Sequence, residues 1–68
     1  MDYTPKFNPE ALRNLRTASD CTQGEFAEKV GISQIHLASL ENGEIEPTAD
    51  QLQIIAQVLH VPIEDIIV

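Results

Sequence analysis

The sequence is poor in cysteine and in long apolar runs, and both shortages limit what the protein can be. Cys21 is the one cysteine among 68 residues, so no disulfide can form within the chain, which favours a reducing, cytoplasmic setting. No apolar run approaches the roughly 18 residues that a membrane-spanning helix needs. The N-terminal residues also lack the apolar core of a signal peptide. We therefore expect no membrane segment.

Basic residues are scarce as well. The chain has 4 Lys and Arg against 11 Asp and Glu, a formal net charge of −7, and residues 44–68 contain no Lys or Arg at all. Domains that bind nucleic acid usually carry a basic surface, because phosphate contacts supply most of the affinity. The composition therefore argues against nucleic acid as a partner.

Features of an enzyme or a metal site are also missing. The chain has no glycine-rich phosphate loop and no Ser-His-Asp set with a nucleophile turn. His36, His60 and Cys21 lack the spacing of zinc ligands. We expect no catalytic activity, no cofactor and no metal ion, and we expect residues 1–68 to form one small domain of packed helices.

Residues 22–43, TQGEFAEKVGISQIHLASLENG, predict two short helices joined by a tight turn. Thr22 is placed to cap the first helix, and Glu25 three residues later completes a capping box. Gly31 is expected to end this helix, because glycine readily adopts the left-handed conformation of a helix stop. The expected inward positions recur at helical spacing and are Phe26, Ala27, Val30, Leu37 and Leu40.

The second of these helices has an outer side without bulky groups. Ser33 is placed to cap it, and the Asn-Gly pair at 42–43 is expected to stop it. Two helices this short need a scaffold to pack on. A helix held on a scaffold with small and polar groups facing outward is suited to entering a groove of DNA. These outward groups are Gln34, His36, Ser39 and Asn42.

The flanking segments supply the scaffold. Asn8-Pro9 predicts the start of a helix that runs to about Ala18. A second capping box at Thr48 predicts a helix that ends at His60, and residues 62–67 predict a last short helix. Residues 1–7 are expected to be an extended arm whose aromatic side chains, Tyr3 and Phe7, pack back on the body.

Many spaced positions match one known family in order. They are Leu12, Leu15 and Arg16, then Thr22, Gln23, Ala27, Gly31, Ser33, Leu37, Glu41 and Gly43, then Pro47, Thr48, Leu52, Ile55, Ala56, Leu59 and Val61. Residues 10–67 thereby resemble the phage-repressor or Xre-type helix-turn-helix family. The resemblance implies an all-α, compact five-helix, lambda repressor-like domain. It also implies a sequence-specific regulator of transcription that inserts the second helix of the motif into the major groove of double-stranded DNA.

The resemblance assigns candidate DNA contacts by position. Gln34 has the amide pair that matches adenine, Ile35 offers apolar contact such as to a thymine methyl, and Ser39 can pair with several bases. Each has a plainer explanation, since a polar residue on a helix face is usually only solvated and Gln23 and Ser33 suit helix starts. The candidates for base contact are Gln34, Ile35, Ser39 and His36. The candidates for phosphate contact are Gln23, Ser33, Asn42 and Lys29.

Two charged residues are given a structural role by the same resemblance. Arg16 and Glu41 are expected to form a partly buried ion pair that ties the first helix to the end of the groove-entering helix. If Arg16 is used in this way, only Lys6, Arg13 and Lys29 remain free to meet phosphate.

The segment after the groove-entering helix disfavours DNA. Glu44 and Glu46 stand where family members often place Lys or Arg, and they would repel phosphate at short range. Binding as a monomer should be weak, so a dimer, or a fusion to another basic surface, would be needed for a working affinity. The apolar C-terminus either closes the core or forms a two-fold dimer contact. The residues concerned are Ile63, Ile66 and Ile67.

A protein partner is the alternative to DNA. The acidic residues would then meet a basic partner, for example another regulator, although acidic runs on small domains often serve only solubility. The acids concerned are Glu44, Glu46, Asp50, Glu64 and Asp65.

Overall fold

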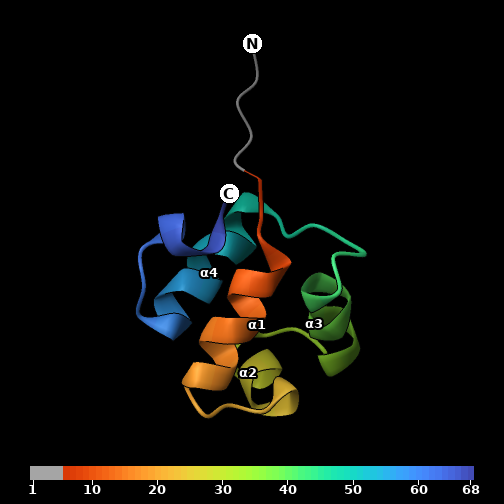
Figure 1. Ribbon diagram of the computed structural model, residues 1–68. Helices are drawn as coiled ribbons and strands as arrows, with labels where there is room; N and C mark the ends of the chain where they lie inside the picture. Colours follow the sequence, from red (N-terminus) through yellow and green to blue (C-terminus); the bar gives the residue numbers. More distant parts are fainter. Residues whose placement is uncertain (1–5) are drawn as a thin grey trace.

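The computed structural model describes residues 6–68, which form four α-helices followed by one short 3-10 helix (Figure 1). In chain order these are α1 (Pro9–Ala18), α2 (Gln23–Val30), α3 (Gln34–Glu41), α4 (Ala49–Leu59) and η1 (Ile63–Ile66). The all-α prediction is confirmed, and the prediction of five α-helices is wrong in its last member. Pro62 precedes a run of only four residues, and the Asp65 N–H bonds to the Pro62 carbonyl, the tighter spacing of a 3-10 turn.

The helix ends lie where the cap residues predict them. Thr22 with Glu25 and Thr48 with Gln51 both form complete capping boxes at the starts of α2 and α4. Gly31 ends α2 in the left-handed conformation with a φ of 88°. These caps satisfy backbone N–H groups that would otherwise lack partners, so they fix where each short helix begins.

One core joins all the elements. α1 contacts α3 and η1, and α2 contacts α3 and α4 (Figure 1). Isolated helices of this length have marginal stability in water, so they are stabilised mainly by burying apolar side chains in this shared core. The largest fully buried side chains are Leu12, Phe26, Leu37, Leu40, Ile55 and Ile66.

The two ends of the described chain lie side by side. Phe7 and Ile67 form an antiparallel bridge, and the Val68 N–H bonds to the Lys6 carbonyl. Phe7 is buried, which confirms that it packs on the body. Lys6 and Phe7, the last two residues of the predicted extended arm, are held against the C-terminus by this backbone pairing. Tyr3 and the rest of the predicted arm lie outside the described residues.

The three isoleucines of the predicted C-terminal contact differ in how deeply they are buried. Ile66 is fully buried in the core of its own chain, so its assignment to a dimer contact is wrong. Ile63 and Ile67 are half-buried and pack against the core. Between residues 6 and 68, none of the helices has the length and hydropathy to cross a membrane.

Candidate nucleic-acid interface

The α3 helix is buried on one side and exposed on the other. Leu37 and Leu40 are fully buried, whereas the side chain of Ile35 is 82% exposed and that of Gln34 is exposed. His36 and Ser39 are half-buried. Of the four candidates for base contact, the structure therefore gives Gln34 and Ile35 an exposed position, at the first turn of the helix.

The first turns of α2 and α3 lie against each other. A Cβ placed on Gly24 would lie 3.4 Å from Oε1 of Gln34, so the Gln34 side chain lies against the start of α2. Ser33 caps α3 by accepting a hydrogen bond from the His36 N–H at 3.0 Å. Free N–H groups at the starts of two helices, close together, favour an anion such as phosphate.

Glu41 connects three helices at the inner end of this site. Arg16 on α1 donates through Nε and Nη2 to the two carboxylate oxygens, and Nε2 of Gln23 on α2 donates to Oε1 at 3.0 Å. The predicted ion pair of Arg16 and Glu41 is thus present, with exposures of only 9% and 2%. Arg16 also donates through Nη1 to the Cys21 carbonyl. The carboxylate holds α3 to α1 and α2 at once.

The pKa of Glu41 reflects these partners. Burial alone would raise it, but hydrogen bonds from Arg16 and Gln23, with the charges of Arg16 and Arg13, outweigh burial and hold the pKa below its ordinary value. Glu41 therefore stays charged, and the ion pair stays intact, at neutral pH.

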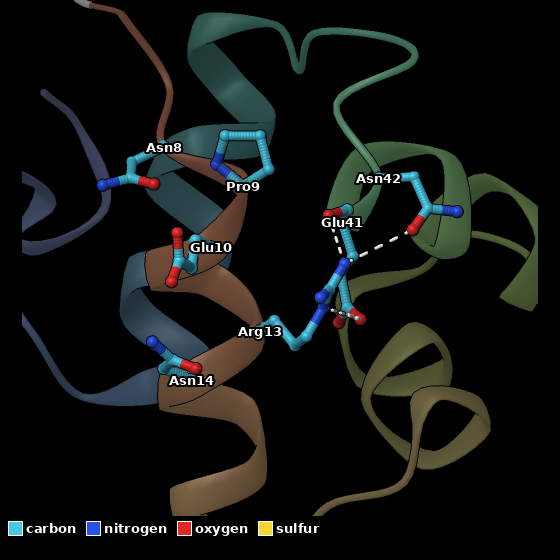
Figure 2. A pocket seen from close by; sticks show the side chains of 7 residues that line it. All are labelled: Asn8, Pro9, Glu10, Arg13, Asn14, Glu41 and Asn42. Carbon is cyan, nitrogen blue, oxygen red and sulfur yellow. Dashed lines mark hydrogen bonds and ion pairs between the residues drawn. The ribbon is translucent and has the colours of Figure 1, made fainter.

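Arg13 is a further member that the sequence interpretation missed. Its Nη2 donates to the Glu41 carbonyl at 2.9 Å and to Oδ1 of Asn42 at 3.3 Å (Figure 2). A cation at this place neutralises carbonyls that the last turn of α3 leaves unpaired. The signal available in the sequence was spacing, since Arg13 lies one turn before Arg16 on the same helix face.

An open groove of about 470 Å³ runs between the start of α1 and the end of α3 (Figure 2). Arg13 spans it from α1, so it is not the free cation that the sequence interpretation assumed. The groove is lined by Asn8, Pro9, Glu10, Arg13, Asn14, Glu41 and Asn42.

The remaining phosphate candidates differ in how free they are. One N–H of the Gln23 amide is used by Glu41, and Oδ1 of Asn42 is used by Arg13. Lys29 is exposed, with Nζ lying 3.6 Å from Sγ of Cys21. Positive charge near the outer side of α3 is therefore sparse. In the part of the chain that the structure describes, His, Cys, Asp and Glu side chains form no group able to hold a metal ion.

The chain is similar in sequence to characterised proteins. The chain is 37% identical over 57 residues to the cryptic phage CTXphi transcriptional repressor RstR of Vibrio cholerae, spanning 84% of this chain and 51% of that one. It is 39% identical over 56 residues to antitoxin PezA of Streptococcus pneumoniae, spanning 82% of this chain and 35% of that one. The chain thus spans about half the length or less of these relatives.

Solved structures share the fold. The clp gene regulator ClgR of Corynebacterium glutamicum superposes with a TM-score of 0.78 at 30% identity, over 84% of this chain and 74% of that one. The family model described as helix-turn-helix matches residues 12–66, which is most of the chain and includes α2, the turn and α3. The chain therefore belongs to the helix-turn-helix family.

Proposed function

We propose that this chain is the DNA-binding domain of a transcriptional regulator and that α3 enters the major groove of a specific operator. The observation that carries the proposal is the division of α3, whose inner side is fully buried while Gln34 and Ile35 project from its first turn. The ion pair of Arg16 and Glu41 fixes the other end of the helix. A short helix fixed at one end and exposed along one side has the shape of a groove-entering element.

The proposed contacts follow from the chemistry of each exposed group. The Gln34 amide pairs with an adenine edge, and Ile35 contacts a thymine methyl. Ser39 lies about one helical turn after Ile35, and His36 follows Ile35 directly, so both are candidates for contact with neighbouring bases. Ser33 and the spare N–H of Gln23 meet phosphate at the two helix starts. Asn42 through its amide N–H group and Lys29 through its ammonium complete the phosphate contacts.

The charge of the domain sets how this binding works. With a net charge of −7 and with Glu44 and Glu46 exposed after α3, one domain gains little from phosphate. We propose that two copies bind a two-fold symmetric operator and that the half-buried Ile67 contributes to the contact between them. RstR is named as a repressor and ClgR as a gene regulator, and this supports the proposal.

Selection from random duplexes tests the proposal. Purified protein is incubated with a pool of random duplex DNA at about 50 mM salt. A later salt titration of the bound DNA separates the electrostatic part of the binding free energy from the part due to specific base contacts. The enriched sequence is then titrated by fluorescence anisotropy. We expect a palindromic sequence, with half-sites about one helical turn apart.

Replacement of Gln34 distinguishes specific contact from general attraction. Gln34→Ala should weaken binding to the selected sequence by about 1–3 kcal/mol and relax the preference at one base pair. Gln57→Ala, which removes an exposed amide from α4, is the matched control and should leave both unchanged. Failure to enrich any sequence, or equal loss in the two variants, would overturn the proposal.

A further inference from the structure

A small apolar cleft lies on the side of the molecule formed by α4, η1 and the turn before α4. Its volume is about 140 Å³, close to the roughly 150 Å³ of an apolar cavity that holds one benzene-sized group. Neither α2 nor α3 lines it, although Glu46 belongs to the segment that follows α3. It is lined by Phe7, Glu46, Pro47, Ala49, Leu52, Gln53 and Ile63.

The rim of this cleft is mostly acidic. Glu46 lines it, Asp50 follows Ala49 in the first turn of α4, and Glu64 follows Ile63 in η1. All three are exposed, and between residues 44 and 68 the sequence has no Lys or Arg to balance them. The ion pairs found between residues 6 and 68 involve Glu41 alone, so none of these three acids has a paired cation among those residues. Lys6, next to the lining residue Phe7, is the basic residue that adjoins the cleft in sequence, so acids outnumber bases there.

We propose that this cleft binds a segment of another protein that inserts one apolar side chain and flanks it with Lys or Arg. The cleft supplies apolar walls for the anchor, and the three acids supply the complementary field for the flanking cations. A second copy of this chain is the poorer occupant, because it would bring its own net charge of −7 to a rim of the same sign.

The test uses a synthetic peptide as the probe. The probe is a single leucine between two short runs of lysine, and its two controls carry serine in place of the leucine or glutamate in place of the lysines. Binding to the full chain is measured by calorimetry at low salt, and the site is located by amide chemical-shift changes. We expect the leucine probe to bind about tenfold more tightly than the serine peptide, because it buries a Leu side chain. The glutamate peptide should not bind, and the shifts should centre on Ala49, Leu52 and Ile63.

Two paired variants separate the cleft from general charge. Glu46→Gln with Asp50→Asn should weaken the leucine probe by roughly fivefold, since two neighbouring charges are lost. Asp20→Asn with Glu28→Gln removes the same charge from exposed positions outside the cleft and should change binding less than about twofold. Ala49→Leu, which fills the cleft, should abolish the advantage of leucine over serine. Thermal unfolding checks that each variant is folded.

Four outcomes would overturn the proposal. Equal binding of the leucine and serine peptides would indicate diffuse attraction, and equal weakening by both variant pairs would indicate the same. Binding that appears only after deletion of residues 1–5 would assign the cleft to the chain's own N-terminal segment. Self-association that competes with the probe would assign it to a second copy.

Discussion

At the scale of single residues, Glu41 links α3 to α1 and α2. Its carboxylate accepts from Arg16 and Gln23, and Nε of Arg13 lies 4.0 Å away. The packing of α1, α2 and α3 therefore depends on one buried carboxylate. A buried ion pair gives modest net stability when it is complete, yet removal of one partner leaves a charge that neither water nor protein satisfies.

The partners of Glu41 differ in burial, and this gives the first prediction at this scale. Arg16→Ala should destabilise the domain by about 3 kcal/mol, because it leaves Glu41 buried without its main partner. Arg13→Ala should cost less than about 1 kcal/mol, since its side chain is 48% exposed. Urea unfolding followed by circular dichroism measures both.

A double variant keeps this comparison interpretable if Arg16→Ala fails to fold. Arg16→Met with Glu41→Leu removes both charges and should be more stable than Arg16→Ala alone. Equal stability of Arg16→Ala and Arg13→Ala would contradict the role given to the buried pair.

The lowered pKa of Glu41 makes stability depend on pH. The group has a pKa below its ordinary value of 4.5 when folded, so the folded state is favoured above pH 4.5 and this advantage is lost as the pH falls through the folded pKa. The urea midpoint of the unaltered chain should therefore drop as the pH is lowered below 4.5. Glu41→Gln should show a shallower drop, and an unchanged slope would argue against the assignment.

Sequence alone located some of these residues and missed others. The resemblance assigned Arg16 and Glu41 to a pair, and the structure has them in contact. The bond from Gln23 to Glu41 and the bridge from Arg13 to Asn42 join residues 18 and 29 positions apart. Such contacts depend on the angle between helices. Local spacing shows only that Arg13 shares a helix face with Arg16, and it does not show which atoms of α3 that face meets.

At the scale of elements, the ends of the helices were predictable and the last element was not. Caps depend on residues three or four positions apart, which the sequence shows directly. The apolar residues Ile63, Ile66 and Ile67 are spaced for one turn of either an α- or a 3-10 helix. The hydrogen bond that decides between them forms only where the chain after Pro62 meets α1 and α4.

Two left-handed helix ends give a paired prediction. Gly31 has a φ of 88° and a Cβ there would meet nothing within 4 Å, so Gly31→Ala should cost about 1 kcal/mol through backbone conformation alone. His60 adopts a φ of 59° at the end of α4, so His60→Gly should stabilise by up to about 1 kcal/mol. Thermal unfolding measures both, at about 4–8 °C per kcal/mol for a domain of this size. Shifts of the same sign would contradict this account.

At the scale of the whole molecule, charge opposes the proposed function. Glu44 and Glu46 follow α3, where a phosphate ridge would lie if α3 occupied a groove. Glu44→Lys with Glu46→Lys should therefore raise affinity for the selected duplex by about tenfold and steepen the salt dependence by about two phosphate contacts.

A second variant with the same change in net charge tests whether position matters. Glu64→Lys with Asp65→Lys places the charges on η1, which packs on α1 and α4. It should raise affinity much less and leave the salt dependence nearly unchanged, because charges on η1 do not follow α3 and add no contact to the phosphates proposed there. Equal gains from both variants would mean that net charge alone governs binding.

The contact between Lys6 and Val68 has a consequence for the topology of the chain. Because the backbones of Lys6 and Val68 are hydrogen-bonded, the two ends of the described chain lie close enough to be joined by a short linker. Joining Lys6 to Val68 with such a linker, and opening the chain within the exposed turn at 43–46, would produce a circular permutant with the same helix packing. Its new ends would emerge beside the end of α3, where an added basic tail could reach the DNA that α3 is proposed to bind.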